Sequence, residues 1–387
     1  MKSNPFFYTI KIYKIIKTNE ERNVVKMKKE VKIALIAIVL IMIVVAAVFF
    51  GIKKSNNEVS GEKEIASSKQ ETKEETEKEN TTKKDDIKIF NGTDRPIAFM
   101  IDNNVNAQPQ ASISKAYIVY EIIVEGNESR LMAIFKGVDA DSVGPIRSSR
   151  HYFLDYAMEN DAIYAHLGMS PQADGDMQKY KINNINGQIY DTGKARTDSS
   201  KYWRVTHKKA PHNAYTNISS IKQIAQEKNY KTTSNKESVL NYVSKEVTLD
   251  SEDAIECNSV TIPYASSHKV QYKYNAETGR YTRWSKGKKM TDEVEKVDIT
   301  TKNIIITFAK NYTLDDGENK GRQDVVTVGE LDGYYITNGK AIKIKCIKKS
   351  REAQTQYVDL NGKEIEVNDG NTWVNICPID ANVVIEK

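Results

Sequence analysis

The sequence predicts a single N-terminal transmembrane helix followed by two folded domains: an α/β or α+β domain over residues 89–250 and a smaller β-rich domain over residues 255–387. Three observations predict this. One apolar run lies near the N-terminus, strand-like and helix-like segments alternate up to about residue 245, and only strand-like segments follow residue 260. A chain of 387 residues also has room for about two domains at roughly 100–200 residues each.

The membrane segment is the run from Ile33 to Ile52, which is uncharged and almost wholly apolar. As a helix it spans about 30 Å, the thickness of a hydrocarbon core. The short basic tail before it, residues 1–32, predicts that the N-terminus stays in the cytoplasm and that the C-terminal domains are extracytoplasmic. A cleaved signal peptide is the alternative, although its apolar region is normally about 7–15 residues long. Translation from Met27 also remains open.

Charge is distributed unevenly along the chain. Of the 57 Lys/Arg and 52 Asp/Glu residues, the tail at 1–32 holds nine and three, so the rest of the chain is nearly neutral. That balance excludes the clustered basic surplus of a nucleic-acid-binding domain. Residues 53–88 are rich in charge and poor in apolar side chains, which predicts a flexible linker.

The first folded domain is predicted from short apolar runs interleaved with helix-like segments. Such runs are typical of buried strands, and Ser148 or Ser149 could cap the first helix. Interleaved strands and helices favour an α/β or α+β architecture. The predicted strands are 96–101, 117–124, 130–138 and 161–167, and the predicted helices are 149–159, 171–180 and 218–227.

The second domain is predicted from β signals alone. Alternating runs at 269–274 and 281–284 flank a turn, and Asn-Gly pairs at 338–339 and 361–362 join further alternating runs. An Asn-Gly pair in this setting favours a type I′ hairpin turn, since both positions need a positive φ. Several hairpins in succession predict the β-rich domain.

A candidate anion site lies at residues 144–150, which read Gly-Pro-Ile-Arg-Ser-Ser-Arg and precede the first predicted helix. The free N–H groups of a helix start, together with Arg147, Ser148, Ser149 and Arg150, could bind a phosphate or a carboxylate. The alternative is structural: the serines cap the helix, and the arginines pair with the protein's own carboxylates.

Acidic and polar side chains near strand ends are further candidates. Asp102 and Asn103 follow the first predicted strand, a common place for sites in α/β proteins and also for ordinary turns. Glu121 and Glu125 are four residues apart on one strand, which separates their Cα atoms by about 13 Å. The carboxylates of a glycosidase pair lie about 5–9.5 Å apart, so these two form a poor acid–base couple. Glu125 could instead pair with Arg130 across a hairpin.

Histidines supply the remaining candidates. His166 ends a predicted strand, and His212 and Asn213 lie in a basic loop. Asp102 or Glu121 could act with His166 as the acid and base of a catalytic site if the fold brought them together. The chain lacks a nucleotide-binding glycine loop, a catalytic serine elbow and the ligand spacing of a zinc site. No cofactor and no metal are therefore expected.

Three cysteines, Cys257, Cys346 and Cys377, exclude a disulfide-dense scaffold and allow at most one disulfide. Cys346 and Cys377 both lie in predicted strands and could pair. We expect all three to be small buried side chains instead.

Several motifs together resemble the YerB-like family. They include Arg-Pro-Ile-Ala-Phe-Met-Ile-Asp-Asn from residue 95, Val-Glu-Gly from residue 124, residues 144–150, Asp-Ala-Ile-Tyr-Ala-His from residue 161, Ser-Pro-Gln-Ala from residue 170, Ala-Pro-His-Asn from residue 210, and the stretch from Asn338 to Trp373. The resemblance covers about residues 90–387. It implies a cell-envelope protein of a Gram-positive bacterium, with N- and C-terminal domains of unknown function and no established reaction.

Two departures from the family pattern matter. Many members look like lipoproteins, but no cysteine lies near the apolar run, so the anchor expected here is residues 33–52. Cys346 stands where the family pattern leads us to expect Trp, which argues against a catalytic thiol.

The function expected is that of a membrane-anchored extracytoplasmic protein that binds an anionic cell-wall polymer or an envelope protein partner. Its candidate ligand-binding residues are Asn103, Glu125, Arg130, Arg147, Ser148, Ser149, Arg150, His212 and Asn213. The alternatives are a hydrolase or transferase acting on cell-wall glycan or peptide, with Asp102, Glu121 and His166 as candidate catalytic residues, and a scaffold whose β-rich domain docks a membrane complex. The sequence identifies neither the ligand nor the oligomeric state.

Overall fold

The computed structural model describes residues 87–387. The predicted tail at 1–32, the predicted membrane run at 33–52 and nearly all of the predicted linker at 53–88 lie outside these residues. Among residues 87–387, no helix is both long enough and apolar enough to cross a membrane.

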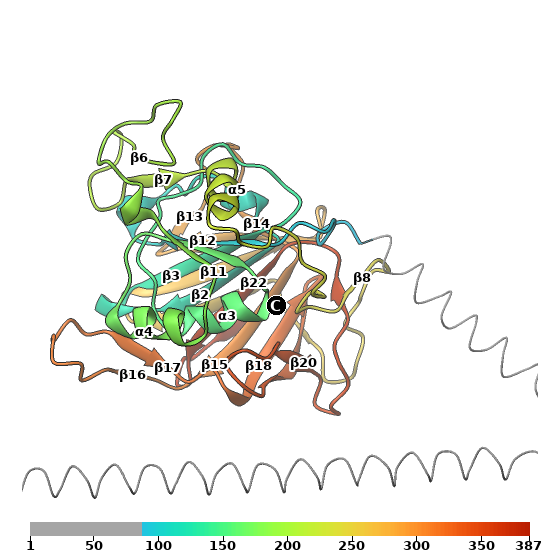
Figure 1. Ribbon diagram of the computed structural model, residues 1–387. Coiled ribbons are helices and arrows are strands. Elements are labelled where there is room, and N and C mark those ends of the chain that lie inside the picture. The colour runs from blue at the N-terminus through green and yellow to red at the C-terminus, as the bar shows by residue number, and fades with distance from the viewer. Residues whose placement is uncertain (1–86) are drawn as a thin grey trace, which may run out of the picture. The chain divides into compact units, whose positions relative to one another are not determined.

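The core of this part of the chain is a mixed sheet of eleven strands (Figure 1). The strands follow the order β20-β19-β18-β15-β22-β2-β3-β1-β4-β5, and β9 also pairs with β19. Both halves of the chain contribute strands to it. Their bounds are β1 Ile97–Asp102, β2 Ile118–Ile123, β3 Ser129–Phe135, β4 Ile163–His166, β5 Asn184–Asn186, β9 Ile255–Glu256, β15 Asn303–Ala309, β18 Gly329–Thr337, β19 Lys340–Lys348, β20 Gln356–Val358 and β22 Thr372–Pro378.

The central strands are buried on both faces and mostly apolar, as is typical of strands covered on both sides. Every residue of β1, β2 and β3 is buried. β3 lies between β1 and β2 and pairs antiparallel with both, whereas β22 runs parallel to both β2 and β15. Thr372 of β22 aligns with Ile118 on one side and with Asn303 on the other, so β22 joins the two halves of the sheet.

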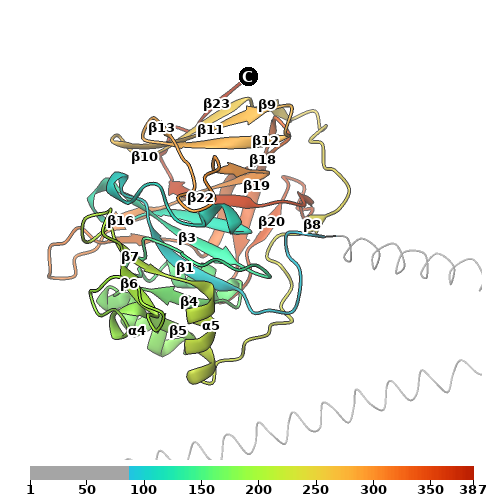
Figure 2. The ribbon, with the colours of Figure 1, turned by 90° about the horizontal axis from the view of Figure 1, so that it is seen from above.

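A smaller sheet packs on one face of the large one. It has the order β13-β12-β11-β10-β23, with β14 paired to β12. Figure 2 shows this sheet and helices α4 and α5 on opposite sides of the large sheet. The bounds are β10 Ser259–Ala265, β11 His268–Asn275, β12 Arg280–Ser285, β13 Lys288–Lys289, β14 Thr300–Thr301 and β23 Val384–Glu386.

The α/β or α+β prediction is wrong, because residues 87–387 are mostly β-sheet with only three short α-helices. These are α3 Phe153–Glu159, α4 Pro171–Lys179 and α5 Ile218–Glu227. The first three predicted strands lie side by side in the order β2-β3-β1, and the segments that connect them hold only short 3-10 turns rather than α-helices. Their sheet then continues into the C-terminal half of the chain.

Turn chemistry explains one hairpin well and another poorly. Asn338 and Gly339 have φ values of 49° and 74°, as a type I′ turn requires, and they join β18 to β19. After Gly362, by contrast, only an isolated bridge between Val358 and Glu364 forms. The next strand, β21 Val367–Asn368, pairs instead with β8 Tyr242–Val243. Two other two-stranded sheets pair β6 Tyr202–Arg204 with β7 Ala214–Thr216 and β16 Asn311–Thr313 with β17 Gln323–Val325.

Candidate functional site

Asp102 is the last residue of β1, where a buried apolar strand ends in a carboxylate. Its Oδ2 accepts a hydrogen bond of 2.7 Å from Nδ1 of His212, and the Nε atom of Arg147 lies 3.2 Å from the same oxygen. The backbone N–H of Asn104 donates to Oδ1. Asp102 therefore contacts a histidine and an arginine from two other segments of the chain.

Two further arginines lie beside Asp102. Arg130 of β3 aligns with Asp102 in the strand register, and its Nη2 lies 3.6 Å from Oε1 of Glu125, so the predicted Glu125–Arg130 ion pair is confirmed. Arg150 holds the same glutamate through both Nε and Nη2. Burial opposes ionisation of Glu125, but Arg150 and Arg130 outweigh it and lower its pKa to about 2.

We call these six residues the arginine cluster: Asp102, Glu125, Arg130, Arg147, Arg150 and His212. Burial and the positive charges of Arg150 and Arg147 lower the pKa of Arg130 to about 10, which still leaves it charged at neutral pH. Three guanidinium groups thus face two carboxylates, and one positive charge is unmatched within the cluster.

Arg147 is the member of the cluster that is most available to a ligand. Its side chain is 25% exposed, compared with 7% for Arg130 and 9% for Arg150. Nη1 donates to the carbonyl of Pro211 at 3.4 Å, and Nη2 forms no hydrogen bond or ion pair with any described residue. A guanidinium with free donors beside an unmatched positive charge is suited to a carboxylate or phosphate.

The predicted helix start at Ser148 and Ser149 is wrong, because α3 begins only at Phe153. Ser148 Oγ donates to the carbonyl of Leu167, and Ser149 Oγ accepts from the hydroxyl of Tyr164. Both serines tie their extended segment to neighbouring loops and strands. They therefore offer no helix N-terminus to an anion.

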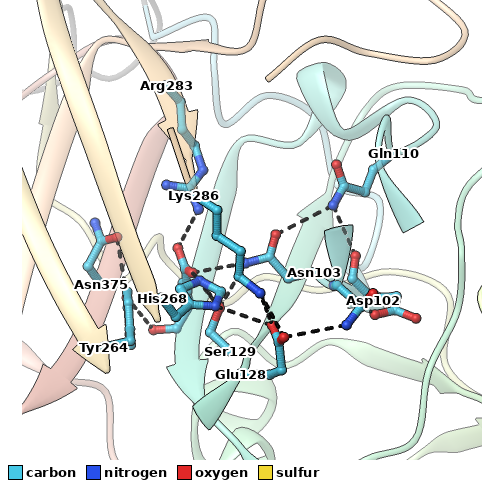
Figure 3. Close-up of polar contacts among 12 residues, drawn as sticks. Asp102, Asn103, Gln110, Glu128, Ser129, Tyr264, His268, Arg283, Lys286 and Asn375 are labelled. Carbon is cyan, nitrogen blue, oxygen red and sulfur yellow. Dashed lines mark hydrogen bonds and ion pairs between the residues drawn. The ribbon is translucent and has the colours of Figure 1, made fainter. Parts of the chain in front are cut away.

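Glu121 lies in a different environment, where it bonds to Arg283, Asn103 and Ser129. Figure 3 labels these three partners within a polar network between the two sheets. Glu121 and Arg283 are both 0% exposed, and Arg283 Nη2 donates to Glu121 Oε2 at 2.6 Å. Asn103 and Ser129 donate to the other carboxylate oxygen. Burial raises the pKa of Glu121, but Arg283 and His268 outweigh it, so the pKa lies below its usual value. A carboxylate held ionised and enclosed in this way is structural and no general acid.

The same network extends to the surface and across to the small sheet. His268 contacts Ser129 and Glu128, and Lys286 donates to both oxygens of Glu128. On the other side, the hydroxyl of Tyr264 donates to the backbone carbonyl of Glu121. These contacts fasten β10, β11 and the turn after β12 onto β2 and β3.

Two predicted site residues lie away from the arginine cluster. His166 is 0% exposed and contacts the carbonyl of Gly168 and the side chain of Asn184, and burial lowers its pKa. Asn213 accepts from Arg204 and donates to the carbonyl of Val205. Within residues 87–387, no hydrogen bond or ion pair joins either side chain to Asp102.

The cysteines are free and buried, as expected: Cys257, Cys346 and Cys377 form no disulfide. Burial raises the pKa of each thiol to about 12, which makes them inert. In the described part of the chain, no group of three or more His, Cys, Asp or Glu side chains is placed to hold a metal ion.

Sequence reasoning missed Arg283, the central cation of the buried network. One signal pointed to it: β12 alternates, so Tyr281, Arg283 and Ser285 all face inward. An arginine at an inward position needs a buried carboxylate partner, which is Glu121.

The fold and the site define a class of protein in which two sheets are fastened by a buried ion pair and a cluster of arginines lies at the end of a central strand. Two family models match the chain: the N-terminal domain of a protein of unknown function (DUF3048) over residues 82–231, and its C-terminal domain over residues 260–374. The chain belongs to this family, which confirms the YerB-like resemblance.

A curated relative and a solved structure agree with this. The chain is 31% identical over 299 residues to the Bacillus subtilis (strain 168) protein named "Putative lipoprotein YerB", a match covering 74% of this chain and 82% of that protein. The crystal structure of YerB protein from Bacillus subtilis matches with a TM-score of 0.65 at 30% identity. That match covers 76% of this chain and 94% of the crystallised one.

Proposed function

We propose that this protein is held at the outer face of the cytoplasmic membrane by the apolar run at residues 33–52 and that its arginine cluster binds an anionic component of the cell envelope. The name of the relative, a lipoprotein, supports a place at the membrane. The chain has no cysteine near the apolar run, so the run itself would serve as the anchor.

One observation carries the binding proposal: the unmatched positive charge of the arginine cluster, together with the free donors of Arg147. Arg130 and Arg150 are nearly buried and are held by Glu125, so they supply positive potential rather than direct contacts. Arg147 supplies the contact. An anion that reaches Nη2 would gain a charge-assisted hydrogen bond in a partly desolvated setting.

The chain contains a matched control for this role. Arg204 is 24% exposed and pairs with Asp191, which is 8% exposed, whereas Arg147 is 25% exposed and pairs with Asp102, which is 6% exposed. Arg204 lies outside the arginine cluster, so substituting it removes a similarly exposed charge that is paired with a carboxylate and leaves the six residues of the cluster in place.

The test uses the full chain in detergent with purified sacculi from Gram-positive cells. Half of the sacculi are treated with hydrofluoric acid to remove phosphodiester polymers. We expect the wild type and Arg204→Gln to pellet with untreated sacculi and Arg147→Gln to stay in the supernatant. Loss of pelleting after the acid treatment would identify phosphate as the anion. Equal pelleting of the two variants would refute the proposal.

The second candidate function, a hydrolase or transferase acting on wall glycan or peptide, is favoured by the Asp102–His212 pair. Asp102 orients the ring through Nδ1, and Nε2 of His212 forms no hydrogen bond or ion pair with any described residue. A carboxylate that orients a histidine in this way prepares the free nitrogen to accept or donate a proton. Glu121 and His166 are too enclosed for such a role.

The same sacculi distinguish the two functions. Mass spectrometry of the supernatant would detect released glycan or peptide fragments if the protein cleaves the wall. Fragments that appear with the wild type and disappear with His212→Gln would establish the enzyme. Pelleting without fragments would leave the binding function.

A further inference from the structure

The loops that flank β6 and β7 continue the positive charge of the arginine cluster. Residues 191–213 contain six Lys/Arg and only two Asp, although the chain after residue 32 is nearly neutral. Figure 1 shows the paired strands β6 and β7 with their loops at the upper left of the fold. Arg147 reaches this segment, because its Nη1 donates to the carbonyl of Pro211. The arginine cluster therefore adjoins a local surplus of positive charge.

Three of the six cations are matched by carboxylates. These pairs are Lys201–Glu227, Arg204–Asp191 and Lys208–Glu293. We call the other three cations, Lys194, Arg196 and Lys209, the basic strip. Each is exposed, and none forms an ion pair with any described residue. Asp198 is exposed and unpaired in the same way, so the segment presents three unmatched cations and one unmatched acid.

Backbone contacts place the two lysines of the basic strip beside the arginine cluster. The carbonyl of Lys209 accepts from the N–H of His212 at 2.9 Å, so Lys209 lies in the turn that contains this member of the cluster. The carbonyl of Lys194 accepts from the N–H of Arg204 at 2.8 Å, and Nη1 of Arg204 donates to the side chain of Asn213. Lys194 thus adjoins the last residue of β6, next to the loop that carries His212.

Arg196 is held in place without being neutralised. Its guanidinium lies 4.5 Å from the ring centre of Trp203, and Nη1 donates to the carbonyl of Asp141 at 3.1 Å. A guanidinium has five N–H donors, so an aromatic ring and a single carbonyl leave most of them free. Because these contacts already order the side chain, binding an anion there costs little conformational entropy.

The separation of these cations along the chain decides the size of the ligand. A small anion at Arg147 meets the arginine cluster alone, whereas the basic strip adds charges on the segment before β6 and on the loop after it. A linear polymer with an anionic group in each repeat can contact several of these cations at once and release the counterions that it holds.

We propose that the ligand is a linear polyanion, with one anionic group at Arg147 and further groups along the basic strip. This rests on the proposed function, because the polymer crosses the arginine cluster. The repeating group can be a phosphate or a carboxylate, since guanidinium and ammonium groups bind both.

The test maps the polymer on the wild-type full chain in detergent by acetylating its lysines and reading each site by mass spectrometry. The probes are long-chain polyphosphate and polygalacturonate, one for each repeating group, and tripolyphosphate and trigalacturonate are their short counterparts. We expect at least one polymer to slow acetylation of Lys194 and Lys209 several-fold and to leave Lys343, an exposed lysine on β19, unchanged. At an equal concentration of charged groups, the short counterparts should protect the basic strip less. Because each lysine is read separately, polymer bound to the basic tail at residues 1–32 is distinguished from polymer on the strip.

Variants test the charges through the same two lysines. Arg196→Gln should raise the polymer concentration that half-protects Lys194 and Lys209 about threefold and lower its dependence on salt by about 0.7 in the log–log slope, the loss of one contact. Arg196→Lys should restore most of the protection because it keeps the charge, and Lys343→Gln, which removes an exposed charge elsewhere, should behave like the wild type. Arg147→Gln should also weaken protection, since the polymer crosses both groups. An unchanged urea unfolding midpoint shows that each variant is folded.

Three results would overturn the inference. Neither polymer protects Lys194 and Lys209 more than Lys343, the short counterparts protect them as well as the polymers do, or Arg196→Gln behaves like the wild type. Failure of the proposed function looks different, because Arg147→Gln would then bind tripolyphosphate as tightly as the wild type.

Discussion

Replacing Glu121 by Gln should be one of the most damaging single substitutions in the chain. The carboxylate and the Arg283 guanidinium are both fully buried and 2.6 Å apart, and Arg283 forms no ion pair with any other carboxylate in residues 87–387. Glutamine keeps the shape but removes the charge, which leaves the cation uncompensated between the two sheets. Breaking a buried pair from one side costs about 3–5 kcal/mol.

The remaining contacts of Arg283 are too weak to offset this loss. Its guanidinium lies 4.2 Å from the ring centre of Trp373, and Nη1 donates to the hydroxyl of Tyr272. A desolvated cation–π contact contributes about 2 kcal/mol and is already present in the wild type. We therefore expect Glu121→Gln to lower the free energy of unfolding by about 3 kcal/mol or more.

Urea unfolding followed by tryptophan fluorescence measures this directly, since Trp373 packs against Arg283. Glu227→Gln is the control, because Glu227 forms a solvent-exposed pair with Lys201 and its loss should change the free energy of unfolding little. The double variant Glu121→Gln/Arg283→Met should recover part of the loss. A Glu121→Gln variant as stable as Glu227→Gln would refute the reasoning.

Three further predictions concern stability. The pKa of Glu125 is about 2, below its usual 4.5, so the contribution of this carboxylate to the free energy of unfolding is present above pH 4.5 and is lost as the pH falls toward 2. In urea unfolding at acidic pH, Glu125→Gln should lack this loss, which is at most about 3 kcal/mol. Burial instead raises the pKa of Asp155 from 3.8 to about 6, so the contribution of this group to the free energy of unfolding is present below pH 3.8 and is lost as the pH rises through 6. Urea unfolding across this range should show Asp155→Asn becoming more stable relative to the wild type, by up to about 3 kcal/mol. Gly333→Ala places a Cβ 2.2 Å from the carbonyl oxygen of Ile306 and should lower the stability measured by thermal unfolding by about 1–3 kcal/mol. Gly175→Ala, inside α4 with nothing within 4 Å, should raise it by about 0.5–1 kcal/mol, and the reverse order of the two variants would contradict the packing.

Local features of the fold could be predicted from the sequence, but its connectivity could not. Apolar runs located β1 to β4, and the Asn338-Gly339 pair located the β18–β19 hairpin, because these signals are confined to a few residues. The parallel pairing of β22 with β2 joins Thr372 to Ile118 and leaves no local trace. Because this pairing could not be predicted, the two halves of the sheet were assigned to two separate domains.

The candidate site shows the same division. The Glu125–Arg130 pair was predictable because only four residues of a hairpin turn separate them. Asp102 and His212 are 110 positions apart in the chain, and their contact depends on where the loop after β6 folds back. The prediction that Ser148 and Ser149 lie at a helix start was wrong, because α3 begins at Phe153, four residues after the predicted start at Ser149.

The affinity of the full chain for tripolyphosphate, measured by calorimetry at low salt, tests the central claim most directly. We predict that Arg147→Gln binds about tenfold more weakly than the wild type, the loss of one charge-assisted hydrogen bond, and that Arg204→Gln binds like the wild type. Equal affinities for all three proteins, or an equal loss in both variants, would contradict an anion site at the arginine cluster.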